Sequence, residues 1–222
     1  MEIHLSQEIK DLYPNFKLGV IQYKHIEVGV SPQMLQGRLR LFQESIYFDL
    51  QNLSINEVEG IKEWRSIFKQ FGTDPSKYRP SIEALYRRIQ KQTYLPSINS
   101  GVDVNNFFSL QYQVPIGIYD MDKLDGSVII SIGHEEDSYT GLNNRAISLV
   151  NKLVSKDSKG AFGSPYVDSN RAPITEQTTN ALQLIYLRPS LHGSNALELT
   201  KSLKEMFIQI HGGEATYSVI SE

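Results

Sequence analysis

A run of polar residues in the middle of the chain is the part of the sequence best suited to chemistry. It contains Asn99, Asp103, Asn105, Asn106 and Ser109. On a helix, residues 99, 103 and 106 lie on one face, and residues 105 and 109 lie together on another. Such side chains can hold a small polar group through several fixed hydrogen bonds. The same spacing also fits helix capping and buried, internally satisfied amides, and spacing alone favours that structural interpretation.

Several common catalytic patterns are missing from the sequence. The chain has no cysteine, which excludes disulfides, thiolate metal sites and thiol nucleophiles. It also lacks the glycine-rich dinucleotide, P-loop, HExxH and GxSxG patterns. Its five histidines are scattered, and no pair has the spacing of metal ligands. We therefore expect no metal and no cofactor.

Charge is unevenly distributed along the chain. The net charge is −3, which argues against strong nonspecific binding of nucleic acid. Residues 62–91, however, hold eight basic and three acidic residues, a local charge of +5 that leaves −8 for the rest. Arg79, Arg87 and Arg88 in this segment are candidates for contact with the phosphate backbone of a nucleic acid. Ordinary exposed helix charge explains them at least as well.

Length and composition bound the class of protein. The chain has 222 residues, of which 40% are hydrophobic and 21% are charged, as in a folded globular protein. We expect one globular domain over residues 1–222. Residues 1–12 lack the apolar region of a secretory signal, and no apolar stretch reaches the ~20 residues that span a bilayer. A cytoplasmic protein that does not contact membranes is expected.

The elements that must position the polar run follow from apolar periodicity. Ser31 and Ser81 have the character of N-caps, Ser100 with Asp103 fits an acidic capping box, and Gly72 has the character of a C-terminal glycine. Helices are predicted at 32–50, 57–71, 82–91, 99–111 and 195–210.

Strands are predicted mainly in the second half of the chain, at 17–28, 116–119, 128–132, 182–187 and 215–220. Residues 184–187 are apolar on both alternating faces, which is typical of a fully buried strand. The polar stretch 143–180 does not favour any one element. This order predicts an α+β fold, with helices mainly in the N-terminal half packed on a mixed or antiparallel β core.

Residues 95–124 resemble the signature of the B3/4 domain, the editing module of the phenylalanyl-tRNA synthetase β subunit. The family pattern has a proline, then I-N, V-D-V-x-N, a helix up to a proline, and an aromatic residue before D-x-D-K-L. It corresponds here to Pro96, Ile98-Asn99, Val102 to Asn106, Pro115 and Tyr119 to Leu124. Residues 71–89 and 166–187 are similar to freestanding relatives of the module. The resemblance covers about residues 60–190, which would form a B3/4-like editing core.

The resemblance implies a concrete activity. The synthetase module hydrolyses tyrosine that is wrongly attached to phenylalanine tRNA. Its substrate is an aminoacyl ester, which is already labile near pH 7, so positioning of water and stabilisation of the oxyanion suffice. A freestanding copy would clear mischarged tRNA in trans, as the second sieve of an editing system. The expected partner is mischarged tRNA, with no DNA and no metal, and nothing in the sequence identifies a protein partner.

The resemblance also implies roles for individual residues. Asn105 and Asn106 match the editing-pocket pair, although synthetases usually have threonine at the position of Asn105. Gly117 stands where synthetase subunits usually have a pocket histidine, and this change affects both rate and tyrosine specificity. The acidic residue that reads a tyrosine hydroxyl is expected within 166–178. The candidate substrate-binding set is completed by the following residues: Asn99, Asp103, Ser109, Gly117, Tyr119, Asp168, Arg171 and Thr175.

Two other functions are consistent with the same residues. In the first, the pocket binds a free amino acid or a nucleotide without catalysis, which Gly117 and the acidic balance of the chain favour. In the second, the protein docks on the translation machinery, which only the basic segment supports. Within the pocket, Arg171 fits a surface salt bridge as well as a phosphate or carboxylate contact, and Glu176 competes with Asp168 for the role of the acid.

Overall fold

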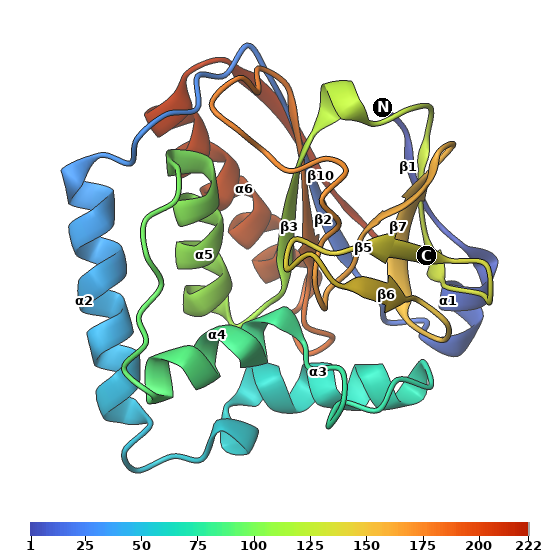
Figure 1. The fold of residues 1–222 in the computed structure, drawn as a ribbon, viewed down its shortest axis with the longest axis horizontal. Helices are drawn as coiled ribbons and strands as arrows, with labels where there is room; N and C mark the ends of the chain where they lie inside the picture. Colours follow the sequence, from blue (N-terminus) through green and yellow to red (C-terminus); the bar gives the residue numbers. More distant parts are fainter. Residues whose placement is uncertain (222) are drawn as a thin grey trace.

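The computed structural model describes residues 1–221, and its helices and strands form layers (Figure 1). The helices are α1 (Gln7–Leu12), α2 (Gln33–Asp49), α3 (Glu59–Gln70), α4 (Ser81–Gln90), α5 (Ser100–Tyr112) and α6 (Gly193–His211). The strands are β1 (Ile3–Leu5), β2 (Leu18–Lys24), β3 (Ile116–Asp120), β4 (Val128–Ile132), β5 (Ser138–Thr140), β6 (Ala146–Ser148), β7 (Leu153–Asp157), β8 (Gly160–Gly163), β9 (Ala181–Tyr186) and β10 (Glu214–Ile220).

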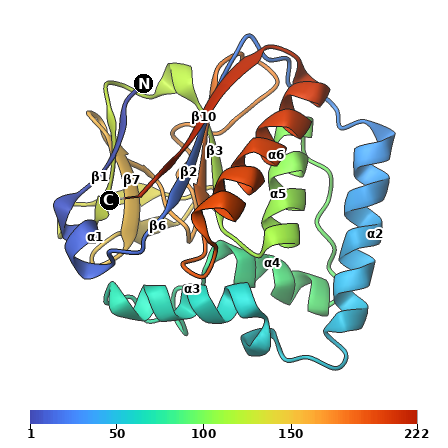
Figure 2. The same cartoon turned by 180° about the vertical axis from the view of Figure 1, so that it is seen from behind.

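The main sheet has the order β10-β2-β9-β3 and is antiparallel throughout. A second sheet, β1-β4-β7-β8, is mixed, because β1 pairs with β4 in parallel and the other pairs are antiparallel. Helices α2, α5 and α6 lie on one side of the main sheet, and the second sheet with α1 lies on the other (Figure 1 and Figure 2). Helices α3 and α4 run across one end of these layers.

Both faces of the main sheet are buried. Ile21 and Ile185 pack with the helices, while Val20 and Leu184 pack with the second sheet. This alternation explains why β9 is apolar on both faces and buried along its whole length, as predicted. The α+β class, with helices before β3 and most strands after it, is confirmed. The stretch 143–180, which the sequence did not assign, contributes short strands from β6 to β8.

Three predicted helix starts are wrong by one residue. Pro32 and Pro80, rather than the neighbouring serines, precede the first turns of α2 and α4. Helix α5 is capped by Asn99, whose Oδ1 accepts from the backbone N–H of Val102 at 2.9 Å, and not by Ser100. At α2 a tertiary contact decides the case, since Ser31 donates its hydroxyl to Asp103 instead of capping.

Other predicted boundaries agree more closely with the structure. Gly72 follows α3 with φ of 81°, a conformation that suits glycine, and Gly212 follows α6 with φ of 65°. Strand β2 is shorter than predicted, because His25 takes a left-handed conformation with φ of 57°. Among residues 1–221, none of the helices combines the length and apolar character that crossing a membrane requires.

Candidate functional site

A cavity of about 290 Å³ lies beside β3, between α4, α5 and the segment 166–174. Its position follows from the sheet order, because β3 is an edge strand and leaves room that the neighbouring elements cover only in part. Its walls are mostly apolar, and Leu85, Val102, Ile116, Ile118, Val167 and Ile174 are among the residues that form them. Its polar lining includes Asn105, Asn106, Ser109, Tyr119 and Asp168, all of which the sequence had singled out.

The two neighbouring asparagines of α5 differ in their bonding. The Asn105 amide donates to the carbonyl oxygen of Ile116 at 2.9 Å and accepts from Nε2 of Gln183 at 3.0 Å. Gln183 in turn accepts from the hydroxyl of Tyr23 at 2.8 Å, so a buried chain of hydrogen bonds ties α5 to β3, β9 and β2. Within residues 1–221, the Asn106 amide has no hydrogen-bond partner, and it lines the cavity. Asn106 is therefore the amide that can bind a ligand.

Ser109 and Asn99 serve the helix itself. The Ser109 hydroxyl, which borders the cavity, donates to the carbonyl oxygen of Val114 at 2.5 Å and closes the C-terminal turn of α5. Asn99 is the N-cap of α5 and does not line the cavity. Asn99 therefore does not share the cavity with Asn106, although the helical spacing had placed both residues on one face.

Asp103 also lies away from the cavity. Its buried carboxylate accepts from the Ser31 hydroxyl at 2.5 Å, from the Ser97 hydroxyl, and from the backbone N–H of Ile98 at 3.1 Å. These bonds join the start of α2 and the segment before α5. Asp103 therefore does not share the cavity with Asn106, because its carboxylate is taken up by Ser31, Ser97 and Ile98.

Gly117 makes room for Tyr119. A Cβ atom at Gly117 would come within 2.1 Å of the Tyr119 hydroxyl oxygen, and a Cβ atom at Gly163 within 2.2 Å of it. The buried Tyr119 ring therefore occupies the space that a side chain at position 117 would need. Tyr119 donates its hydroxyl to Oδ1 of Asp168 at 2.6 Å. Gly117 thus leaves the space for Tyr119, and Tyr119 in turn donates a hydrogen bond to Asp168, the acidic residue of the cavity.

Asp168 sits in an environment that disfavours its charge. Burial raises its pKa to about 6, although the hydrogen bonds from Tyr119 and from the backbone N–H of Ser164 oppose this change. Burial, followed by the neighbouring Asp168 charge, raises the pKa of Tyr119 well above its ordinary value. Tyr119 is therefore a neutral donor, and Asp168 titrates close to physiological pH.

Arg171 and Thr175 are placed outside the cavity. The guanidinium of Arg171 forms a bidentate pair with Asp157, at 2.8 and 3.1 Å, and also donates to the carbonyl oxygen of Gly160. Of the two interpretations of Arg171, the structure favours the salt bridge. The Thr175 hydroxyl bonds to Gln177 within a surface turn. Neither residue lines the cavity.

The basic segment is partly neutralised. Glu83 of α4 is fully buried and accepts from Arg65 at 2.9 Å and from Arg87 at 2.8 Å, with Arg79 at 3.8 Å. Two of the three arginines proposed for tRNA thus take part in an internal ion-pair cluster. Arg88 is exposed, with no ion pair among the described residues.

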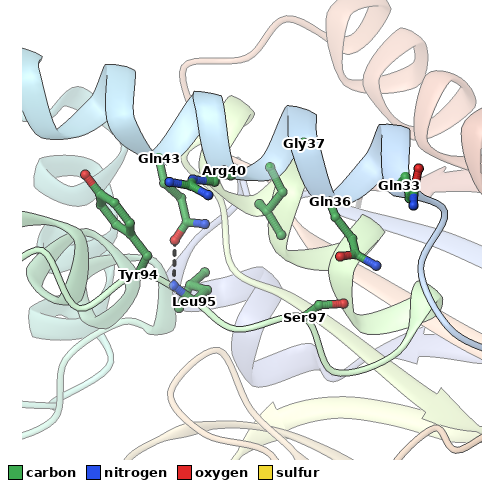
Figure 3. Close-up of a pocket in the computed structure, with 9 residues that line it drawn as sticks. Gln33, Gln36, Gly37, Arg40, Gln43, Tyr94, Leu95 and Ser97 are labelled. Carbon is green, nitrogen blue, oxygen red and sulfur yellow. Dashed lines mark hydrogen bonds between the residues drawn. The ribbon is translucent and has the colours of Figure 1, made fainter.

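A larger hollow of about 420 Å³ lies between α2 and the segment 94–97 (Figure 3). Its lining is polar, with Gln33, Gln36 and Arg40 along α2, and Gln43 accepts from the backbone N–H of Leu95 at 2.7 Å. Among the described residues, the lining of this hollow contains no acidic side chain, and its Gln33 amide is exposed at the surface rather than enclosed by apolar walls. We therefore place the functional site in the cavity beside β3.

One further polar pair was missed by sequence reasoning. Nε2 of His211 lies 2.8 Å from the Ser100 hydroxyl, and Nδ1 lies 2.7 Å from the carbonyl oxygen of Phe207. Burial lowers the pKa of His211, so the ring is neutral at pH 7. The pair has the composition of a nucleophile and base, but both residues are buried away from the cavity. It links α5 to α6, and the distance of 111 residues between the two left no local signal.

Comparison with known sequences relates the chain to one domain family. The family model described as the B3/4 domain matches residues 63–202. The chain is 38% identical over 216 residues to the uncharacterised Bacillus subtilis protein YhzB, covering 97% of this chain and 98% of that protein. It is 32% identical over 101 residues to the phenylalanine–tRNA ligase β subunit of Psychrobacter arcticus, covering 44% of this chain but only 13% of that subunit.

Among solved structures, the chain is similar to an N-terminal fragment of the phenylalanyl-tRNA synthetase β subunit from Pyrococcus horikoshii. The TM-score is 0.47 at 12% identity, and the match covers 100% of this chain and 54% of that fragment.

Proposed function

Because the chain belongs to the B3/4 domain family, we propose that it is a cytoplasmic editing hydrolase that removes wrongly attached amino acids from tRNA in trans. The proposal rests on the Asn106 amide, which has no hydrogen-bond partner among residues 1–221 and lines a largely apolar cavity of about 290 Å³. That volume suits an aminoacyl group rather than a whole nucleotide. Relatives named as phenylalanine–tRNA ligase β subunits support an aminoacyl-tRNA as the substrate.

The reaction needs little from the protein. Water adds to the ester carbonyl carbon, the bond from this carbon to the ribose oxygen breaks, and the ribose oxygen takes up a proton from the attacking water, which releases the free amino acid. The Asn106 amide would donate to the carbonyl oxygen as negative charge develops there. The apolar walls would hold the side chain of the amino acid and fix the ester against the amide. Asn105, whose bonds are already made, would keep α5 and β3 at the correct separation.

The tRNA would approach along α4. This helix borders the cavity through Ala84 and Leu85 and carries Arg87 and Arg88 on its last turn. Phosphate contacts by such residues would position the tRNA end without reading its sequence. Binding that weakens as salt increases is therefore expected.

The test is deacylation of a panel of mischarged tRNAs, starting with tyrosyl-tRNA for phenylalanine. We expect hydrolysis above the uncatalysed rate for at least one of them. The Asn106→Ala variant should fold normally and lose about 100-fold in kcat/KM, as when one oxyanion donor is removed. Asn52→Ala is the matched control, since Asn52 is exposed in the turn after α2. Full activity of Asn106→Ala would remove this residue from the site.

A second candidate function is binding of a free amino acid without turnover. It is favoured by the absence of any histidine among the residues within 1–221 that line the cavity. Isothermal titration with free amino acids separates the two functions. Tight binding combined with no hydrolysis of any tRNA in the panel would establish the binding module and overturn the hydrolase.

A further inference from the structure

Only one of the two carboxylate oxygens of Asp168 accepts hydrogen bonds from residues 1–221. Its Oδ1 accepts from the Tyr119 hydroxyl at 2.6 Å and from the backbone N–H of Ser164 at 3.3 Å. Its Oδ2 has no hydrogen-bond partner among residues 1–221, and the residue lines the cavity. One oxygen is therefore fixed by the protein, and the other is available to a ligand.

Asp168 also lacks a counter-charge. Other carboxylates at buried positions are matched: Glu83 pairs with arginines, Asp157 pairs with Arg171, and Asp103 accepts three hydrogen bonds. Among the described residues that line the cavity, Asp168 is the only charged one. The Asp168 carboxylate is half-buried, and a charge partly removed from water is favoured by a counter-charge, so the missing positive charge points to the ligand.

We propose that Asp168 binds the α-ammonium group of the aminoacyl ligand through Oδ2, and that Tyr119 is the positioning residue that holds the carboxylate in place. This inference rests on the proposed function and names the chemical class of the ligand group at that site. A primary ammonium supplies both the hydrogen-bond donor and the charge that the cavity lacks. A substrate phenol would supply only the donor, and the tyrosine of the protein already makes that kind of bond.

The packing around Tyr119 supports a fixed geometry. The ring lies against Gly117 and Gly163, where any Cβ atom would collide with it, and packs edge-on against Phe162 with ring centroids 4.8 Å apart. The Tyr119 hydroxyl that donates to Asp168 is therefore held in a fixed position. A carboxylate held this way loses little further freedom when a ligand binds.

Binding should have an optimum near neutral pH. The titratable groups that face Asp168 are Tyr119, Tyr139 and Tyr186, and burial raises the pKa of each, so all three are neutral. Asp168 must be ionised, which requires a pH above about 6. The ligand amine must be protonated, which requires a pH below roughly 8 for an ordinary α-amino group.

The experiment compares two non-hydrolysable probes by isothermal titration at pH 7.0. The first is phenylalanyl-adenosine with an amide in place of the ester, and the second is its phenyllactyl counterpart, in which a hydroxyl replaces the ammonium. Because the two are nearly identical in shape, the comparison isolates the charge. We expect the phenylalanyl probe to bind at least tenfold more tightly, and Asp168→Asn to make the two probes equal.

A second variant tests the positioning role. In Tyr119→Phe the ring remains but the hydrogen bond to Asp168 is lost, and that bond lowers the pKa of the carboxylate. The acidic midpoint of binding should therefore move to higher pH, a change that loss of packing alone would not produce. An unchanged midpoint would refute the positioning role of Tyr119.

The outcomes separate this inference from the proposed function. Equal affinity of the wild type for both probes, or no binding of either at millimolar concentration, overturns the ammonium site even if mischarged tRNA is hydrolysed. A strong preference for the ammonium probe that Asp168→Asn abolishes supports the site, even if no tRNA in the panel is hydrolysed. In the latter case only the proposed hydrolase function is refuted.

Discussion

Helix α5 has polar residues on two sides, and the two sides are built differently. On the side of α2, Asp103 accepts three hydrogen bonds and is fully buried. On the side of β3, the Asn106 amide has no partner within residues 1–221, and the nearby Asp168 uses only one carboxylate oxygen. Both sides contain a carboxylate and lie within the same fold. They differ in whether the protein itself satisfies the polar groups.

This contrast separates structure from function better than residue type does. A buried group whose bonds are complete stabilises the fold and has no capacity left for a ligand. A group that is shielded from water but incompletely bonded costs stability, and it is retained where a ligand supplies the missing partner. Asn106 and Asp168 are half-buried and incompletely bonded among the described residues, so by this criterion we propose that the β3 side is the binding site and the α2 side a structural support.

The largest expected effect comes from changing each carboxylate to its amide. Asp103→Asn should lower the free energy of unfolding by about 3 kcal/mol, because an amide cannot accept all three hydrogen bonds that the carboxylate accepts. Asp168→Asn should raise it by about 1 kcal/mol at pH 7.5, because an unpaired, half-buried charge is removed. Urea denaturation with a constant m-value measures both. If both substitutions changed the free energy of unfolding in the same direction, the proposed difference between the two sides of α5 would be wrong.

The effect of Asp168 on stability should depend on pH. Its pKa in the folded state is about 6, above the ordinary value of 3.8, so the ionised group is destabilising above pH 6. As the pH falls through 6, the wild type should gain stability relative to Asp168→Asn. The difference in Tm between the wild type and Asp168→Asn, followed from pH 8 to pH 5, measures this effect.

A smaller difference in stability is expected between the two asparagines. Asn105→Ala leaves the Ile116 carbonyl and Nε2 of Gln183 without partners, and should cost about 2 kcal/mol. Asn106→Ala breaks no hydrogen bond within the described chain and should change stability by less than about 0.5 kcal/mol. The same denaturation series measures both. If Asn106→Ala proved the more destabilising, the assignment of a free amide would be wrong.

The smallest effect concerns the basic residues of α4. Arg88→Ala should weaken tRNA binding only a few-fold and reduce the slope of log affinity against log salt by about 1, with no change in stability. Arg87→Ala is the comparison, because Arg87 also pairs with the buried Glu83 and its loss should lower the Tm. Binding titrations at two or more salt concentrations measure the slope. A slope unaffected by Arg88→Ala would place the tRNA elsewhere.

Sequence periodicity predicted helices α2 to α6 and strands β2, β3, β4, β9 and β10, but it missed α1 and β1 near the start of the chain. Helices α3 and α5 and strands β3, β4 and β9 lie within two residues of their predicted ranges, because burial of one face or of both leaves a clear local pattern. The strands between 143 and 180 left no such pattern, because β6 and β8 are only three and four residues long and β7, with the sequence LVSKD, is apolar only at its first two residues. Ser31 and Ser100 do not cap their helices because their hydroxyls bond to distant partners, Asp103 for Ser31 and His211 for Ser100.

For the site, the sequence by itself determined which residue types are present and, through the resemblance, the family. It selected Asn105, Asn106 and Asp168 together with residues such as Asp103 and Arg171. Only the tertiary structure decided among them, because whether a polar side chain is free depends on partners far away in the chain. Asn105 is bound by Gln183, 78 residues away, and Tyr119 reaches Asp168 across 49 residues. Hydrogen bonds over such separations follow from the packing of sheet and helices, which local sequence does not encode.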